Sequence, residues 1–126
     1  MSNPTARVKL LLIDDDPSIV EALAARLFRY FEVQGVTDPT QALSAACTFR
    51  PDVILCDINM PGMNGDEVAL KLSQDRATSR IPLLYLSASM PDGTITELGG
   101  SFGGLTGVSK AASIDQLLEA IRSVMP

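Results

Sequence analysis

Short runs of consecutive apolar residues alternate along this chain with longer stretches in which apolar residues recur every three or four positions. Such runs are typical of strands buried on both faces of a sheet, and the longer stretches are typical of amphipathic helices. The expected strands are residues 9–13, 32–36, 53–56, 81–86 and 105–108. The alternation predicts an α/β fold, with a five-stranded parallel sheet, helices on both faces and right-handed crossovers.

The helical stretches carry recognisable start and stop signals. The first shows its core face in four residues spaced by four: Ile19, Leu23, Leu27 and Phe31. Asp16-Pro17 and Asp38-Pro39 each place a capping carboxylate before a proline, which is a typical helix start. Arg50-Pro51 is expected to end the second helix, and the third is expected from about residue 66 to 74.

The last two segments where helices are expected differ sharply in how strongly their sequences favour a helix. Ser113-Ile114-Asp115-Gln116 is a capping box, and an apolar stripe follows it, so a well-defined last helix is expected. The segment 92–104 instead contains five glycines, each of which costs up to about 1 kcal/mol inside a helix. The fourth helix is therefore expected to be short, irregular or absent.

Composition limits the classes of protein that fit. The chain has 126 residues, of which 46% are apolar, so a single domain over residues 1–126 with no output domain is expected. The net charge of -5 argues against direct nucleic-acid binding. No segment resembles a signal peptide or a membrane span, which predicts a cytoplasmic protein without membrane insertion. Cys47 and Cys56 are expected to be reduced core residues, and the chain contains no histidine.

Polar residues follow four of the five expected strands. Asp14 and Asp15 follow the first, Asp57 the third, Ser87 the fourth and Lys110 the fifth. Because parallel strands end at one edge of a sheet, these side chains should share a rim. Three close carboxylates favour a hard cation such as Mg²⁺, and an ammonium with a hydroxyl suits a phosphoryl oxygen. Each residue alone also fits a helix cap, a strand-end cap or a solvated lysine, so the prediction depends on their joint order.

With these motifs in place, the chain resembles receiver domains of response regulators in two-component signalling, of the single-domain, chemotaxis-regulator-like kind. The most specific motif runs from Pro51 to Gly65 and reads Pro-Asp-Val-Ile-Leu-Cys-Asp-Ile-Asn-Met-Pro-Gly-Met-Asn-Gly. It is joined by Leu-Leu-Leu-Ile-Asp-Asp-Asp-Pro up to Pro17, by Ser87-Ala88 and by Lys110. The resemblance implies a flavodoxin-like doubly wound sheet with strand order 2-1-3-4-5.

The resemblance also implies a phosphoprotein. Asp57 would accept a phosphoryl group from a phosphohistidine on a sensor histidine kinase or a histidine phosphotransfer protein. Ser87 and Lys110 would contact the transferred group. The chain would assist its own phosphorylation and dephosphorylation without being an enzyme for another substrate. It would act on a protein target that the sequence does not identify, or serve as a phosphate sink in a phosphorelay.

Magnesium is the cofactor that the resemblance implies. Asp15 would bind Mg²⁺ directly, and Asp14 largely through water. Asp57 and the backbone carbonyl group of Asn59 would complete the protein ligands.

Two positions depart from the family pattern. Receivers usually carry a large, often aromatic residue three positions before the lysine, where this chain has Gly107, and a proline after the lysine, where it has Ala111. Without that proline, we expect a trans peptide bond after Lys110, because a cis bond would cost about 2.5 to 4 kcal/mol. Without an aromatic side chain at residue 107, we expect the signal to be an ordering of the segment 89–104.

Two other functions remain open at this point. Asp14-x-Asp16-x-Ser18 after an apolar strand resembles the nucleophile motif of haloacid-dehalogenase-like phosphohydrolases. That family needs a further acidic pair on a strand beyond the lysine, where only a helix is expected here. It also leaves the motif around Asp57 unexplained. A pseudo-receiver that binds partners without being phosphorylated is the second alternative. The intact acceptor, acidic and lysine positions count against it.

Overall fold

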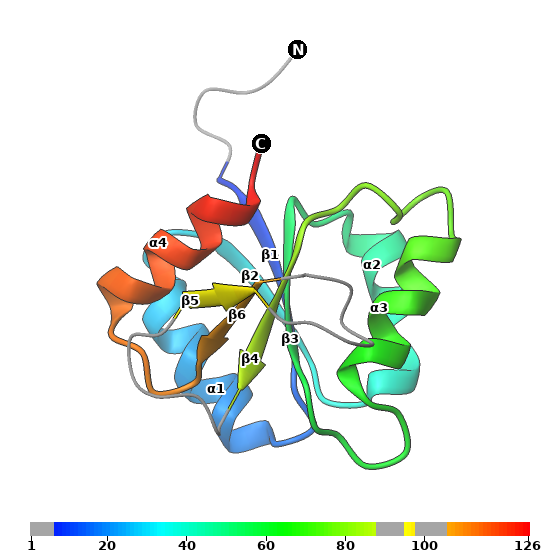
Figure 1. Ribbon diagram of the computed structural model, residues 1–126, viewed down its shortest axis with the longest axis horizontal. Helices are drawn as coiled ribbons and strands as arrows, with labels where there is room; N and C mark the ends of the chain where they lie inside the picture. Colours follow the sequence, from blue (N-terminus) through cyan, green and yellow to red (C-terminus); the bar gives the residue numbers. More distant parts are fainter. Residues whose placement is uncertain (1–6, 88–94, 98–105) are drawn as a thin grey trace.

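The computed structural model describes residues 7–87, 95–97 and 106–126, and it forms a layered α/β fold (Figure 1). The strands are β1 (Lys9–Ile13), β2 (Glu32–Val36), β3 (Val53–Asp57), β4 (Leu83–Ser87), β5 (Ile95–Glu97) and β6 (Thr106–Ser109). The helices are α1 (Pro17–Leu27), the short 3₁₀ turn η1 (Pro39–Gln41), α2 (Ala42–Phe49), α3 (Gly65–Gln74) and α4 (Ile114–Val124).

The sheet confirms the predicted topology. Its order is β2-β1-β3-β4-β6-β5, and the first five of these strands are parallel. Because β6 is the fifth parallel strand along the chain, this order is the predicted 2-1-3-4-5. The parallel arrangement brings the carboxyl ends of β1, β3, β4 and β6 to one edge, as a shared functional rim requires.

A sixth strand, which the sequence analysis did not predict, lies at the edge of the sheet. β5 pairs antiparallel with β6, with Thr96 opposite Gly107. It falls in the segment where an irregular fourth helix was expected, and two of its three residues, Ile95 and Thr96, are β-branched and favour strands. The remaining residues of the segment 89–104 lie outside the described part of the chain, and so does the predicted ordering change there.

Two helical layers cover the sheet. In Figure 1, α1 and α4 lie on one side of it, and α2 and α3 on the other. Residues that alternate along a strand enter different cores: Leu10 and Leu12 pack beneath α1 and α4, whereas Leu11 and Ile13 pack beneath α2 and α3. Coverage on both faces explains why the strand sequences are continuously apolar. None of the described helices is long and apolar enough to cross a bilayer.

The predicted helix starts are confirmed at both Asp-Pro pairs. The Asp16 carboxylate accepts a hydrogen bond from the Ser18 amide at 2.9 Å, and α1 follows directly. The Asp38 carboxylate accepts from the Thr40 amide at 3.0 Å, but the chain first forms the 3₁₀ turn η1 before α2 begins. α2 ends at Phe49, and the capping residue that follows, Arg50, adopts a left-handed conformation with φ of 54°.

The prediction for the two cysteines is half right. Cys56 is buried in β3, but Cys47 is exposed, so its assignment to the core was wrong. The buried face of α2 is formed by Ala42 and Ala46. Cys47 follows Ala46 by one position, which turns it about 100° around the helix and away from the sheet.

Candidate functional site

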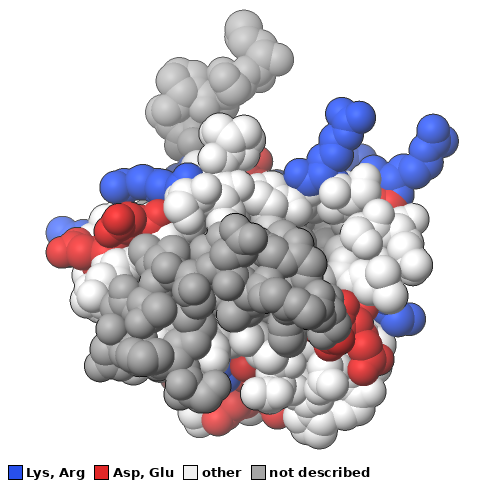
Figure 2. Space-filling view, in the orientation of Figure 1, with Lys and Arg blue, Asp and Glu red and all other residues white. Residues whose placement is uncertain are grey.

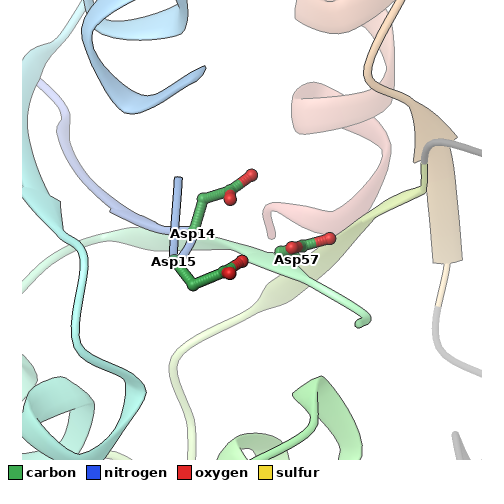
Figure 3. Close-up of side chains that lie close together, drawn as sticks. All are labelled: Asp14, Asp15 and Asp57. Carbon is green, nitrogen blue, oxygen red and sulfur yellow. The ribbon is translucent and has the colours of Figure 1, made fainter. Parts of the chain in front are cut away.

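Three carboxylates meet at the carboxyl ends of β1 and β3 (Figure 3). Asp14 is fully buried, Asp57 is 4% exposed, and Asp15 is half-buried. Each offers a carboxylate oxygen, and these three oxygens lie within 4.8 Å of one another. Like charges at this distance repel one another, so the cluster requires positive charge nearby.

Lys110 supplies part of that positive charge. It follows β6, and its Nζ lies 2.8 Å from Asp14 Oδ2 and 3.1 Å from Asp57 Oδ1. The lysine side chain is only 16% exposed, so water screens these ion pairs less than it would at the surface. The ammonium therefore links the two buried carboxylates that come from different strands.

Burial and charge shift the pKa values of this pair. Burial raises the pKa of Asp57, the hydrogen bond from Lys110 opposes this rise, and the charge of Asp14 adds to it. For Lys110, burial alone would lower the pKa, but the hydrogen bonds to Asp14 and Asp57 outweigh that effect and raise it. Lys110 is thus held in its charged form, whereas the charged form of Asp57 is disfavoured relative to an exposed aspartate.

A close backbone contact fixes the loop after Asp57. The Gly65 amide donates to the Ile58 carbonyl group at 2.8 Å, so the start of α3 folds back against the end of β3. A Cβ atom at Gly65 would lie 2.4 Å from the Asp57 backbone oxygen, which is too close for any side chain. Only glycine allows this approach, which explains why the motif after Asp57 ends in Gly65.

The remaining predicted site residues lie on the same rim. Ser87 is buried at the end of β4, and its carbonyl group accepts a hydrogen bond from the Lys110 amide at 2.9 Å. Asn59 is exposed and lies two residues beyond Asp57 in the loop. Asp16 is the exposed cap of α1, and its amide donates to Asp14 Oδ1 at 3.0 Å. The structure thus gathers Asp14, Asp15, Asp57 and Lys110 in space. The roles predicted for these four residues, and for Ser87 and Asn59, stay predictions.

The sequence analysis missed three residues near the site. Ser109 and Arg26 hold the turn that follows Lys110, through hydrogen bonds to Ala111 and Ala112. Tyr85 is fully buried in β4 beside Gly107 of β6, with which it pairs. The available signals were a serine directly before the lysine, a missing proline after it, and an aromatic residue two positions before Ser87.

Acidic side chains are also present on the surface near the carboxyl ends of the parallel strands. Figure 2 shows Asp and Glu side chains at the lower edge of this face, where the parallel strands end, and further acidic side chains beside Lys and Arg at its left and right sides. A cation or a cationic group that approaches the rim therefore meets a favourable field.

A doubly wound parallel sheet with an acidic cluster and a lysine at its carboxyl edge defines a known class of signalling domain. The sequence model of the response regulator receiver domain matches residues 10–122, and the chain belongs to this family. Receiver domains are phosphoacceptors of two-component signalling that bind Mg²⁺ at an acidic pocket. They interact with histidine kinases or phosphotransfer proteins.

Individual relatives agree with this assignment. The chain is 41% identical over 85 residues to the DNA-binding response regulator MtrA of Mycolicibacterium smegmatis, which covers 67% of this chain and 36% of MtrA. It is 36% identical over 118 residues to the response regulator PleD of Caulobacter vibrioides, covering 93% of this chain and 24% of PleD. The chain thus spans about a third of MtrA and a quarter of PleD.

The fold also has close structural neighbours. The chemotaxis protein CheY4 of Vibrio cholerae superimposes with a TM-score of 0.78 at 26% sequence identity. The match covers 95% of this chain and all of that one. Membership of the receiver family removes the basis for a haloacid-dehalogenase-like phosphohydrolase, and the Asp16 of that motif serves here as a helix cap.

Proposed function

We propose that Asp57 accepts a phosphoryl group from a phosphohistidine on a sensor histidine kinase or a histidine phosphotransfer protein. The observation that carries this proposal is the pair of contacts from one ammonium, that of Lys110, to the buried carboxylates of Asp14 and Asp57. Asp57 ends the central strand β3, between β1 and β4, and faces the acidic residues that follow β1. Asp14 is also buried and also contacts Lys110, but it follows β1, whereas Asp57 ends the central strand.

The donor set at this site fits magnesium. Three carboxylate oxygens within 4.8 Å of one another are the hard ligands that Mg²⁺ prefers. We assign Asp14, Asp15, Asp57 and the Asn59 carbonyl group as the residues that would hold the ion. When bound, Mg²⁺ would offset the negative charge of the carboxylates and of the incoming phosphoryl oxygens.

The transfer itself needs positioning and charge more than covalent assistance. A carboxylate oxygen of Asp57 forms a bond to phosphorus as the N–P bond of the phosphohistidine breaks, and the electron pair of that bond stays on the donor imidazole. Lys110 stabilises the negative phosphoryl oxygens, and the Ser87 hydroxyl group contacts the transferred group. The chain supplies no base for this step, because a carboxylate nucleophile has no proton to lose.

The wider role is proposed on the same basis. We assign the chain to the cytoplasm, as is typical of the family, where it would act as a receiver. Phosphorylated Asp57 would either change how the chain binds a protein target or store phosphate as a sink. No activity toward a separate substrate is proposed.

Phosphorylation can be tested directly with a small donor. The chain is incubated with acetyl phosphate and Mg²⁺, and its intact mass is measured over time. We expect the mass of one added phosphoryl group in the native chain and none in Asp57→Asn. Asp52→Asn is the matched control, because Asp52 lies in the loop before β3, where its carboxylate accepts from the Lys9 amide. This variant should label normally. An unlabelled native chain would support a pseudo-receiver instead, and equal labelling of Asp57→Asn would refute the acceptor.

A further inference from the structure

The position of the Lys110 ammonium depends on how its backbone is held. Lys110 lies at the point where β6 ends and the chain turns toward α4. Its amide is fixed by the Ser87 carbonyl group at 2.9 Å, which aligns it with β4. That bond leaves the direction of the following residues free, so a second constraint is needed to aim the side chain at Asp14 and Asp57.

The second constraint comes from Ser109, the residue just before the lysine. Its Oγ accepts a hydrogen bond from the Ala111 amide at 3.0 Å, and its carbonyl group accepts from the Ala112 amide at 3.1 Å. Ser109 is 2% exposed, so its hydroxyl group has little access to water. These two bonds close a turn that has Lys110 at its centre, in the manner of other serine side chains that bond the backbone two residues ahead.

This turn depends on the absence of proline at residue 111. A proline there would have no amide hydrogen to donate, so the bond from Ala111 to Ser109 could not form. The part of the chain that the structure describes contains no cis peptide bond, in line with the trans bond expected after Lys110. In this chain a side-chain hydrogen bond therefore restricts the backbone conformation of the turn, whereas the ring of a proline would restrict it covalently.

Arg26 of α1 anchors the far end of the same turn. Its Nη2 donates to the Ala112 carbonyl group at 2.8 Å, across 86 positions of sequence. The turn is thus fixed to β4 on one side and to α1 on the other, and Lys110 lies between the two anchors.

We propose that Ser109 is a positioning residue for Lys110, and that its hydroxyl group takes over the part that proline usually plays after the lysine. This inference rests on the proposed phosphorylation of Asp57. Loss of the hydroxyl group releases the Ala111 amide and lets the turn relax, which moves the ammonium away from the phosphoryl oxygens while the carboxylates stay in place.

The test compares Ser109→Ala with Ser109→Thr, which keeps the hydroxyl group. Because a displacement of about 1 Å can cost up to about 100-fold in rate, we expect Ser109→Ala to lower the maximal rate of labelling by acetyl phosphate about 10- to 100-fold. The Mg²⁺ concentration at half-maximal rate should stay unchanged, since Asp14, Asp15 and Asp57 remain. Ser109→Thr should restore most of the rate. Ser123→Ala is the matched control, because the Ser123 hydroxyl group also bonds the backbone, by donating to the Ala120 carbonyl group, but within α4 and away from Lys110.

A structural readout accompanies the rates. Amide hydrogen exchange, resolved by NMR, should show the Ala111 amide protected in the native chain and in Ser109→Thr, but exchanging faster in Ser109→Ala. Normal labelling of Ser109→Ala, unchanged exchange at Ala111, or failure of Ser109→Thr to restore the rate would each overturn this inference alone. Absence of labelling in the native chain would instead overturn the proposed function on which it rests.

Discussion

Two aspartates of this chain, Asp38 and Asp57, show how different surroundings give one side chain opposite properties. Asp38 is exposed at the start of η1, where its carboxylate accepts from the amide of Thr40 at 3.0 Å and from its hydroxyl group at 2.7 Å. These bonds lower the pKa of Asp38. Asp57 is buried at the end of β3, and its pKa is raised by burial even though Lys110 lies 3.1 Å away.

The difference lies in where the hydrogen-bond donors come from. Asp38 finds both donors within two residues, so local sequence satisfies it completely and it serves the fold. Asp57 depends on one ammonium from a distant strand and shares it with Asp14, so its charge is only partly offset. A buried carboxylate with an incomplete set of partners is typical of functional sites, because it can bind a further cation or an electrophile.

The largest effect on the rate of labelling should come from removing the Lys110 ammonium, which Asp14 and Asp57 share. Lys110→Met deletes the ammonium but keeps an apolar chain of similar length, and we expect labelling of Asp57 by acetyl phosphate to slow about 100-fold. The matched variant Lys71→Met changes an exposed lysine of α3 and should label at the native rate. Rates within twofold of each other for the two variants would show that Lys110 does not stabilise the transferred group.

The second prediction concerns stability in the presence of Mg²⁺. At a concentration of 100 times Kd, a ligand that binds only the folded state raises the free energy of unfolding by about 2.7 kcal/mol. We expect a gain of this size in thermal or denaturant unfolding of the native chain, and a much smaller gain in Asp15→Ala.

Asp38→Ala gives the control for that measurement. It removes a carboxylate outside the site and should keep the full Mg²⁺ effect. Equal Mg²⁺ stabilisation of Asp15→Ala and the native chain would place the ion elsewhere.

The third prediction is the pH dependence without Mg²⁺. The raised pKa of Asp57 means that the folded state binds this proton more tightly than the unfolded state does, so the contribution of Asp57 to stability falls as pH rises past its unfolded pKa of about 3.8. Asp57→Asn should therefore melt at a higher temperature than the native chain at pH 7 in EDTA. The two should converge in acid, where Asp57 is protonated. A variant that is less stable at pH 7 would show that the Lys110 contact outweighs burial.

The smallest change in stability is expected for substitution of Asp38. Its contribution to stability depends on pH in the opposite direction to that of Asp57. Because its pKa is lowered, its stabilising contribution is present above pH 3.8 and is lost as pH falls through the folded pKa. Asp38→Ala should lower the melting temperature by a few degrees at pH 7 and leave labelling of Asp57 unchanged. Paired melting curves and labelling rates check both parts, and a labelling defect would mean that η1 is coupled to the site.

Much of the fold could be predicted because its signals are local. Apolar runs fixed the parallel strands, and Asp16 and Asp38 before prolines marked helix starts that the structure confirms. The grouping of polar residues at one edge of the sheet was predictable too. Parallel strands end at the same edge, so Asp14, Asp57 and Lys110, which each follow or end such a strand, must lie near one another.

What was missed depends on three-dimensional context. Cys47 is exposed because it lies one position beyond the buried Ala46 on α2. A broad run of apolar residues does not show which of two neighbouring positions faces the sheet. β5 forms through pairing with β6, a choice that strand propensity over three residues does not reveal. The hydrogen bond from Arg26 to Ala112 joins positions far apart in sequence, so no local sequence pattern predicts it.

Location of the phosphoryl group on the chain tests the central claim most directly. After labelling with acetyl phosphate and Mg²⁺, borohydride reduction converts an aspartyl phosphate to homoserine, and peptide mass spectrometry identifies the residue that changed. The account predicts homoserine at Asp57 and at no other aspartate. Homoserine at Asp14 or Asp15, or at several aspartates in similar amounts, would contradict it.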